Sequence, residues 1–345
     1  MKVAHFVRYG PHQSGLYETT RDMCAAEIKM GLDSYIVDTI HMETQGEPRQ
    51  TAAFDRGVVV NPPDKADDAD VHVLHSGIPE PLFGKKPIVV VLHGAPEYVF
   101  HSEVMLHEKG DRGFSTILGY GRTKEVKSFV TLWKRHVPYW QSVLGEAKVS
   151  FVPCGVSLDE FKPGGEAEVF VTSGSPNIGY ADSWRPTFFQ DPFRVIQGVR
   201  EYWKKDQKAR LHLFGTPSGA RRDVVWDRYI LAVKRQGDFF GQIYELREGM
   251  DKVYRGLDIL VTTNIDESRV VREALCCGTR VVAPVGAEFT EWTANIASPS
   301  DVAAAITAAL EDNRLREVRA NESSSRYDSK AMAEGMKAVY EKVAG

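Results

Sequence analysis

The chain has 345 residues, of which 43% are hydrophobic and 26% are charged, and its formal net charge is −4 at pH 7. This length predicts two globular domains, and the composition excludes a disordered chain. The slightly acidic balance excludes a basic tail, so binding to nucleic acid would depend on a local basic patch. The 4 cysteines lack zinc-type spacing, and no apolar run is long enough for a signal peptide or a membrane span. We therefore expect a cytoplasmic protein.

The first half of the chain alternates short apolar runs with polar loops. We expect strands at residues 3–7, 34–37, 57–60, 71–74, 88–92 and 148–152, a helix at residues 17–30, and a long helical region at residues 102–144. The strand–helix–strand opening is the unit of a parallel sheet, whose ligands bind at the carboxyl ends of the strands. Residues 88–92 are all apolar, as in a strand that is covered on both faces.

A second α/β series follows a turn-rich linker. We expect strands at residues 168–172, 210–214, 238–241, 259–262 and 280–283, and helices at residues 192–204, 221–234, 246–256 and 270–276. Two such series in one chain predict two Rossmann-like domains. The segment 329–343 is amphipathic and needs a surface to pack against.

Five segments resemble motifs of the family 4 glycosyltransferases, in the family's order along the chain. They are Ser14-Gly15 with the helix that follows, residues 70–75, the linker string 151–163, residues 239–241 and residues 273–283. The resemblance implies the α/β fold called GT-B, with two Rossmann-like doubly wound domains facing a central cleft. It also implies an acceptor domain at residues 1–152, a hinge at 153–165, a nucleotide-sugar-binding domain at 166–325 and a helix at 326–345 that crosses back to the first domain.

The resemblance implies a retaining, metal-independent glycosyltransferase that moves a sugar from a nucleotide diphosphate-sugar to a hydroxyl acceptor, such as a glycan or a lipid. It implies no cofactor, and we expect no obligate protein partner. Two alternatives stay open. One is a glycosyltransferase that acts on a hydroxymethylated base in DNA. The other is a catalytically degenerate GT-B protein that binds a nucleotide-sugar without turning it over.

The donor's phosphates need a cationic partner when no metal serves, because negative charge builds on the leaving group. The resemblance gives this role to Arg185, and Gln190 stands where the family has a lysine. We expect Gln190 to bond to a phosphate without balancing its charge. Gly15 follows the first strand and is expected to let the donor pass close to the backbone. Backbone N–H groups of residues 173–180 are a further candidate for phosphate contact.

Acidic residues around the helix at residues 270–276 form the rest of the expected donor site. By the resemblance, Glu273 holds the ribose hydroxyls from the start of that helix, and Glu267 faces the sugar as a catalytic residue, with Asp266 as its competitor. Ile265 stands where the family has its other glutamate, which favours the binding-only alternative, as Gln190 does. The remaining donor-binding candidates are Arg269, Val270, Val271 and Gly241.

On the first domain, the resemblance places His93 beside the transferred sugar or the acceptor hydroxyl, as a catalytic residue. His93 follows a buried strand and precedes a glycine, so it is expected at the sheet's carboxyl edge. Glu97 and His12 are the acceptor-binding candidates. His75 ends the preceding strand, and we expect it to be structural. We predict no metal site, since the Asp68-Ala69-Asp70 string lies in an acidic turn that reads as solvated surface.

One segment, residues 122–136, mixes basic and aromatic side chains and is the candidate contact for nucleic acid or a membrane surface. Its basic residues are Arg122, Lys124, Lys127, Lys134, Arg135 and His136, and the aromatic residues in and after it are Phe129, Trp133, Tyr139 and Trp140. The alternative is an amphipathic segment that buries its aromatic rings and solvates its lysines.

Overall fold

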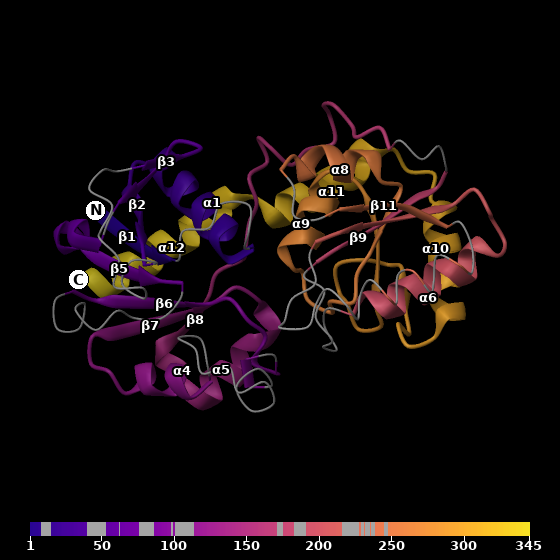
Figure 1. Ribbon diagram of the computed structural model, residues 1–345. Helices are drawn as coiled ribbons and strands as arrows, with labels where there is room; N and C mark the ends of the chain where they lie inside the picture. The colour runs from indigo at the N-terminus through magenta and orange to yellow at the C-terminus, as the bar shows by residue number, and fades with distance from the viewer. Residues whose placement is uncertain are drawn as a thin grey trace. The chain divides into compact units, whose positions relative to one another are not determined.

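The computed structural model divides the chain into two compact units, Met1–Val156 with Tyr327–Gly345, and Ser157–Arg326 (Figure 1). It describes residues 1–7, 15–39, 53–61, 63–75, 86–97, 99–100, 114–170, 175–182, 191–215, 228, 231, 235, 239–244 and 248–345. The first unit, unit 1, therefore combines both ends of the described chain, and the second, unit 2, is one continuous segment.

Unit 1 is built on a sheet in which eight described strands follow the order β3-β4-β2-β1-β5-β6-β7-β8. The strands are β1 (Lys2–Val7), β2 (Asp33–Asp38), β3 (Ala53–Asp55), β4 (Val58–Asn61), β5 (Val71–Leu74), β6 (Ile88–Leu92), β7 (Val126–Thr131) and β8 (Val149–Phe151). Neighbouring strands pair in parallel, except that β3 runs antiparallel to β4. Every residue of β5 and β6 is buried, as expected for strands covered on both faces.

Helices cover both faces of this sheet. They are α1 (Gly15–Lys29), α4 (Phe114–Gly121), α5 (Val137–Leu144) and α12 (Ser329–Ala344), with short 3-10 helices η1 (Pro63–Asp68), η3 (Lys134–His136) and η4 (Glu146–Lys148). Met23 of α1 and Met336 of α12 pack on one face with Val73. Trp140 of α5 packs on the other face with Leu74. In Figure 1, α12 runs beside α1, although the two helices lie at opposite ends of the chain.

Unit 2 is built on a parallel sheet in which six described strands follow the order β11-β10-β9-β12-β13-β14. The strands are β9 (Asn177–Ala181), β10 (Arg210–Phe214), β11 (Phe240–Tyr244), β12 (Ile259–Val261), β13 (Arg280–Pro284) and β14 (Thr293–Ala294). This is the doubly wound order of a Rossmann domain, and it reverses direction between β9 and β12. The predicted Rossmann-like architecture is therefore confirmed for both units.

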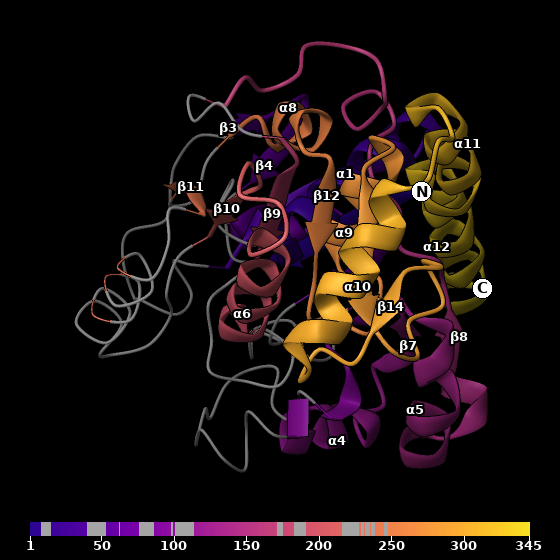
Figure 2. The same ribbon diagram turned by 90° about the vertical axis from the view of Figure 1, so that its right-hand side faces the viewer.

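The helices of unit 2 pack on this sheet and on each other. They are α6 (Pro192–Trp203), α8 (Met250–Gly256), α9 (Arg269–Cys276), α10 (Pro299–Leu310) and α11 (Arg316–Tyr327). Helices α6 and α10 lie side by side (Figures 1 and 2) and share a core with Ile178, Leu211 and Val261 of the sheet. Helix α8 packs against α9, and α9 packs against β13.

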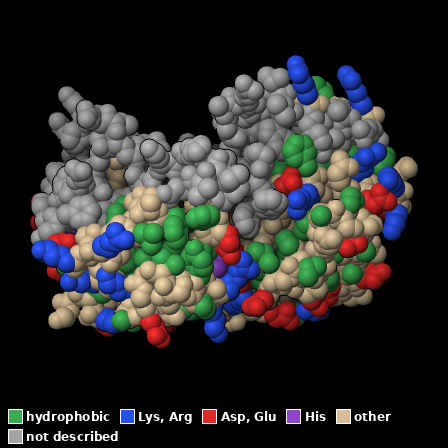
Figure 3. All heavy atoms as spheres, turned by 90° about the horizontal axis from the view of Figure 1, so that it is seen from below, with side chains coloured by type: hydrophobic (Ala, Val, Ile, Leu, Met, Phe, Trp, Pro, Cys, Tyr) green, Lys and Arg blue, Asp and Glu red, His purple; other side chains and the backbone are tan. Residues whose placement is uncertain are grey.

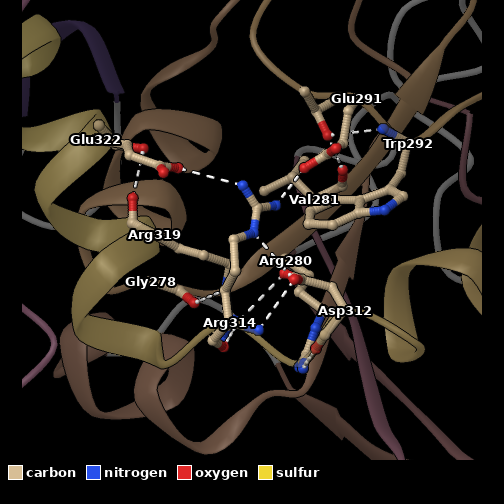
Figure 4. A network of polar contacts seen from close by, with 11 residues as sticks. Gly278, Arg280, Val281, Glu291, Trp292, Asp312, Arg314, Arg319 and Glu322 are labelled. Atoms are coloured by element: carbon tan, nitrogen blue, oxygen red, sulfur yellow. Dashed lines mark hydrogen bonds and ion pairs between the residues drawn. The ribbon is translucent and has the colours of Figure 1, made fainter.

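An arginine network holds the start of α11 to the sheet of unit 2 (Figure 4). Arg314 pairs with Asp312 (2.9 Å), Glu322 (3.4 Å) and Glu291, and its guanidinium lies over the Trp292 ring. Arg319 donates from Nε to the carbonyl of Gly278 at 3.0 Å, at the turn between α9 and β13. These contacts stabilise the fold of unit 2, because the partners of both arginines are backbone and side-chain groups of that unit.

Two sequence predictions of secondary structure are wrong. The expected helical region at residues 102–144 contains strand β7 between α4 and α5. The strand expected at residues 168–172 is absent from residues 168–170, and the first strand that the structure describes in unit 2 is β9. Residues 177–180 are therefore strand rather than a phosphate-binding loop. The expected strand at 238–241 is β11, which starts at Phe240, and most of the expected helix at 221–234 lies outside the described residues.

The chain passes between the two units at Val156 and again at Tyr327, and these two points are bonded to each other. The Val156 N–H donates to the Tyr327 carbonyl at 2.9 Å, and the Ser329 N–H donates to the Val156 carbonyl at 3.2 Å. Gly155 is required here, because a Cβ atom on it would lie 2.6 Å from the Ser329 backbone. Among the helices that the structure describes, none has the length and apolar character needed to span a membrane.

Candidate functional site

Two histidines meet at the carboxyl edge of the sheet in unit 1. His93 follows β6 and His75 follows β5, and these strands are neighbours. The His75 Nδ1 and His93 Nε2 atoms are 2.7 Å apart, within hydrogen-bond distance. His75 is 2% exposed, whereas His93 is partly exposed, so His93 is the member of the pair that solvent reaches. Glu97, four positions after His93, is exposed.

The histidine pair continues into the core of unit 1. His75 Nε2 lies 3.0 Å from Nδ1 of His5 on β1, and His5 Nε2 lies 2.8 Å from Oε2 of Glu27 on α1. The Glu27 carboxylate also accepts from the hydroxyls of Tyr340 (2.7 Å) and Ser34 (2.6 Å). Sequence reasoning missed His5, Glu27 and Tyr340. Tyr340 is 313 positions from Glu27, and all three residues lie inside elements whose sequence patterns indicate only a buried core.

Burial is the main cause of the shifted pKa values of His75 and Tyr340. It lowers the pKa of His75 well below its ordinary value, and the neighbouring His93 and His5 lower it further. Burial also raises the pKa of the Tyr340 phenol, and so does the Glu27 carboxylate beside it. His75 is therefore a neutral imidazole, and Tyr340 keeps its proton and donates to Glu27.

Of the other candidates in unit 1, Gly15 is exposed and is the first residue of α1, the helix that follows β1. A helix start at this position is the usual place for a phosphate in a Rossmann domain. His12 lies outside the described residues.

In unit 2, polar groups gather where the strand order reverses. Asp182 follows β9, and its carboxylate accepts from Nδ2 of Asn264, which follows β12, at 2.7 Å. The backbone N–H of Asp191 donates to the Thr263 hydroxyl at 3.3 Å. The segment from 182 to 191 thus begins and ends at the loop after β12. Arg185 and Gln190 belong to that segment, but they lie outside the described residues.

Glu273 lies in α9 and is 6% exposed. Its Oε1 atom pairs with Nε of Arg269 at 2.5 Å, and its Oε2 atom accepts from the Tyr254 hydroxyl at 3.0 Å. Burial, and then the Glu273 charge, raise the pKa of Tyr254 well above its ordinary value, so Tyr254 remains a donor. The Arg269 guanidinium also lies 5.9 Å from the centre of the Phe161 ring. The predicted helix-start position of Glu273 is wrong: α9 begins at Arg269, so Glu273 is in the second turn, beyond the helix-dipole effect.

The loop before α9 holds the other acidic candidates. Glu267 forms an ion pair with Arg326, and its carbonyl accepts from Nη1 of Arg272 at 2.6 Å. Asp266 lies beside Glu267 and is partly buried, and its backbone carbonyl accepts from the Ser268 N–H at 2.7 Å. Ile265 packs near Gly286, where a Cβ atom would lie 3.2 Å from its Cδ1 atom.

The three remaining donor-binding candidates differ in exposure. Val270 is partly exposed, so its side chain is available to a ligand. Val271 is fully buried, so its side chain belongs to the core. Gly241 lies against His212 of β10, because a Cβ atom at residue 241 would be 2.4 Å from the imidazole. That contact explains the glycine by packing.

In and next to the segment 122–136, the basic side chains are mostly exposed and several aromatic rings are buried. Phe129 and Trp140 are fully buried, and His136 is 3% exposed. The lysines and arginines of the segment are exposed, and so is Tyr139. Figure 3 shows one face of the molecule, on which Lys and Arg side chains are dispersed among hydrophobic ones. Phe129 and Trp140 are unavailable for stacking on a base or for insertion into a lipid surface.

The acidic turn of unit 1 is held by Lys2. The Lys2 backbone N–H donates to the Asp70 carboxylate at 2.8 Å, and its Nζ atom lies 3.6 Å from Asp68. Within the described part of the chain, no group of three or more His, Cys, Asp or Glu side chains is arranged to hold a metal ion.

Two Rossmann-like units in one chain agree with the GT-B fold class, and comparison with solved structures shows that fold here. The chain is similar to HepE from Anabaena in complex with UDP-glucose, with a TM-score of 0.74 and 12% identity over 99% of this chain and 100% of that one. It is similar to the pneumococcal O-GlcNAc transferase GtfA in complex with UDP and GlcNAc, with a TM-score of 0.70 and 11% identity over 99% of each chain.

A third similar structure, from Listeria monocytogenes, is described as a UDP-N-acetylglucosamine 2-epimerase. Its TM-score is 0.62, with 11% identity over 99% of this chain and 97% of that one. No protein-family model matches the sequence, and no curated protein matches it. At these identities the likeness shows the fold, and function must be argued from the site.

Proposed function

We propose that this protein is a glycosyltransferase that moves a sugar from a nucleotide diphosphate-sugar to a hydroxyl acceptor. The observation that carries the proposal is the strand order of unit 2, which reverses between β9 and β12. Open α/β sheets bind nucleotides at such a reversal, outside the carboxyl ends of the strands. Asp182, Thr263 and Asn264 lie at that point in unit 2. UDP is bound in the similar structures of HepE and GtfA, so UDP-sugars are the first donors to test.

In this proposal the nucleotide is held by unit 2. Glu273, which pairs with Arg269 and accepts from Tyr254, is proposed to accept the ribose hydroxyls as well, since each carboxylate oxygen can accept two hydrogen bonds. Arg185 stabilises the charge that builds on the diphosphate as it leaves, and Gln190 adds a hydrogen bond. The further donor contacts proposed are Glu267, Arg269 and Val270 in unit 2, together with Gly15 of unit 1.

Unit 1 serves the acceptor. His93 is the described histidine at the carboxyl edge that is partly exposed, which supports a contact with the reacting hydroxyl. Glu97 is proposed to bind the acceptor, together with His12. We propose retention of configuration and no metal requirement, as the resemblance to the family 4 enzymes implies, and a cytoplasmic location, as the cysteine usage favours.

The binding-only alternative is favoured by two observations. Glu273 is already engaged by Arg269 and Tyr254, and Ile265 packs by Gly286 instead of presenting a carboxylate. A protein of this kind would bind a nucleotide-sugar without breaking the sugar–phosphate bond. Incubation with labelled UDP-glucose, followed by chromatography of UDP and glucose, separates the two functions, since only an enzyme releases UDP.

Calorimetric titration tests the donor site directly. We expect the native chain to bind UDP and UDP-glucose, and the Glu273→Gln variant to lose at least tenfold in affinity for both, because an amide offers fewer acceptors to the ribose. Arg185→Ala should weaken binding of UDP far more than binding of uridine, since charge-assisted hydrogen bonds contribute roughly 1.5–3 kcal/mol.

The matched control is Glu334→Gln, an exposed glutamate on α12. Melting curves must first show that Glu273→Gln is folded, because this change leaves the buried Arg269 opposite a neutral amide. Unaltered binding of UDP-glucose by folded Glu273→Gln removes Glu273 from the donor site. If none of UDP, GDP, ADP and their glucose derivatives binds the native chain, the proposal is wrong.

A further inference from the structure

A line of hydrogen-bonded imidazoles connects the edge of unit 1 with its core. It runs from His93 through His75 and His5 to Glu27, with consecutive distances of 2.7, 3.0 and 2.8 Å. His5 and Glu27 are 0% exposed and His75 is 2% exposed. His93, which is partly exposed, is therefore the end of the line that meets solvent.

The Glu27 end fixes the direction of every hydrogen bond in the line. An ionised carboxylate only accepts, so His5 must carry its proton on Nε2 and present a bare Nδ1. The bare Nδ1 atom accepts from His75, whose own proton is then on Nε2. By the same step His75 Nδ1 accepts from His93 Nε2. His93 thus carries its proton on Nε2, and its Nδ1 atom is the basic nitrogen.

Glu27 is the carboxylate at the buried end of the line. In the described part of the chain its carboxylate bonds to two neutral hydroxyls, those of Ser34 and Tyr340, and to His5, rather than to a lysine or an arginine.

We propose that this line is a proton relay, in which His93 takes a proton from the acceptor hydroxyl and Glu27 finally holds it. The inference rests on the proposed function, because that function supplies the hydroxyl. The hydroxyl O–H bond breaks as the His93 Nδ1–H bond forms. The His93 Nε2 proton passes to His75, the His75 Nε2 proton to His5, and the His5 Nε2 proton to Glu27.

The relay balances without any other reactant. The acceptor oxygen forms its bond to the sugar on the face from which the diphosphate leaves, as retention requires, and the diphosphate leaves with the electron pair of the broken sugar–diphosphate bond. The imidazoles end neutral with their protons on Nδ1, and each hydrogen bond survives with its direction reversed. Return of the proton to solvent through His93 restores the starting state. His93 is then the catalytic residue, and His75, His5 and Glu27 act through it.

Other titratable groups lie close to the relay's buried end. Cys24 on α1 has a raised pKa, owing to burial first and then to the charges of Glu27 and Asp33, so its thiol is neutral. Asp33, at the start of β2, is exposed. Tyr340 of α12 is a protonated donor, and Ser34 of β2 is uncharged. At the other end, His75 and His93 face each other.

Nitrogen NMR of the full chain with labelled histidine tests the relay and needs no sugar. At neutral pH we expect His5, His75 and His93 all to be protonated on Nε2. As the pH falls, the native chain should take up a proton through His93. In Glu27→Gln, and equally in His5→Gln, this uptake should move to lower pH by about one unit or more. The first variant removes the buried acceptor, and the second removes the hydrogen bonds that couple this acceptor to His75 and His93.

The two variants separate a relay from a field that acts through space. If the Glu27 charge acted only through space, Glu27→Gln would move the His93 titration and His5→Gln would leave it in place. That result, or a His75 protonated on Nδ1 in the native chain at neutral pH, overturns the relay. Tyr340→Phe gives the opposite sign: it withdraws a hydrogen bond from the carboxylate, so proton uptake should move to higher pH.

Melting curves establish which variants fold. If neither Glu27→Gln nor His5→Gln folds, the direction of the pH shift in Tyr340→Phe decides whether the relay is supported. Glu334→Gln, on the exposed side of α12, is the control and should leave the His93 titration unchanged. The outcomes are independent of the proposed function. Calorimetry can show UDP-sugar binding while the NMR titration contradicts the relay. Conversely, the NMR titration can support the relay in a chain that binds no UDP-sugar.

Discussion

At the scale of single residues, His212 shows how unit 2 depends on one neutral imidazole. It lies in β10 with its Nε2 atom 3.1 Å from Oδ1 of Asn177, and its ring packs 4.0 Å from that of Phe170. Gly241 lies against the same ring. Burial, and then the charge of Arg210, lower the pKa of His212 from 6.5 to about 4. The folded state therefore excludes the proton that the unfolded chain accepts.

This shift predicts a dependence of stability on pH. Because the folded-state pKa lies below the unfolded value, the contribution of His212 is complete above pH 6.5 and is lost as the pH falls to about 4. At about 1.4 kcal/mol per pKa unit, the loss is roughly 3 kcal/mol. Urea unfolding followed between pH 7 and pH 4 measures it.

The His212→Gln variant keeps a donor for Asn177 but cannot be protonated in this range. It should therefore lose less stability than the native chain over the same pH interval. Equal losses for the two proteins would show that other groups cause the acid sensitivity of unit 2.

At the scale of elements, the contact between α6 and α10 depends on a glycine. Gly198 lies in α6, and a Cβ atom on it would be 2.3 Å from Cγ1 of Val302 in α10. In an exposed helix, replacing glycine by alanine stabilises by roughly 0.5–1 kcal/mol. Here Gly198→Ala should destabilise instead, by about 1–3 kcal/mol, because the extra methyl overpacks the interface. Thermal melting measures the change.

A double substitution tests that explanation. Gly198→Ala combined with Val302→Ala removes the clashing methyl groups, so the pair should cost less than the sum of the two single changes. Strict additivity would mean that the two side chains do not compete for the same space.

Sequence reasoning located strands that are largely apolar, even where a polar residue interrupts them, as His72 does in β5 (VHVL). Strand β6 (IVVVL) is an example, and its bounds agree with the expectation at both ends. Strand β9 reads NIGYA and was missed. Its glycine, Gly179, weakens the strand pattern, yet the fold requires it, because a Cβ atom there would lie 2.3 Å from Leu257. Gly179 therefore both allows β9 to pack in the centre of the sheet and makes β9 hard to recognise from the sequence.

In the candidate site, too, some residues could be predicted from the sequence and others could not. His93 and its place at the sheet edge could be predicted, because a histidine after a buried strand needs only local information. The partners of His93 could not, since His5, Glu27 and Tyr340 come together only after β1, α1 and α12 have packed. Likewise, Glu273 was expected from its motif, but its ion pair with Arg269 follows from where α9 begins.

At the scale of the whole molecule, unit 1 depends on the far end of the chain. Met332, Met336 and Tyr340 of α12 are fully buried in its core. A chain that ends at Arg326 should therefore keep unit 2 folded and lose the native packing of unit 1, because large buried side chains each contribute about 2–5 kcal/mol. Hydrogen exchange read separately over Met1–Val156 and Ser157–Arg326 measures this.

A chain that ends at Tyr340 is the matched control. It keeps the buried face of α12 and the hydrogen bond to Glu27, so both units should remain protected from exchange. Full protection of unit 1 in the chain that ends at Arg326 would contradict the part assigned to α12.

The bonded crossing points at Val156 and Tyr327 set an order for biosynthesis. A ribosome synthesises the whole of unit 2 before it makes Tyr340, at about 5–20 residues per second, so β1, β5 and β6 wait roughly 10–70 s for the helix that covers them. In most multidomain chains the N-terminal domain finishes first. Here the middle of the chain matures ahead of its beginning, and during that interval the nascent protein presents apolar strands on which molecular chaperones act.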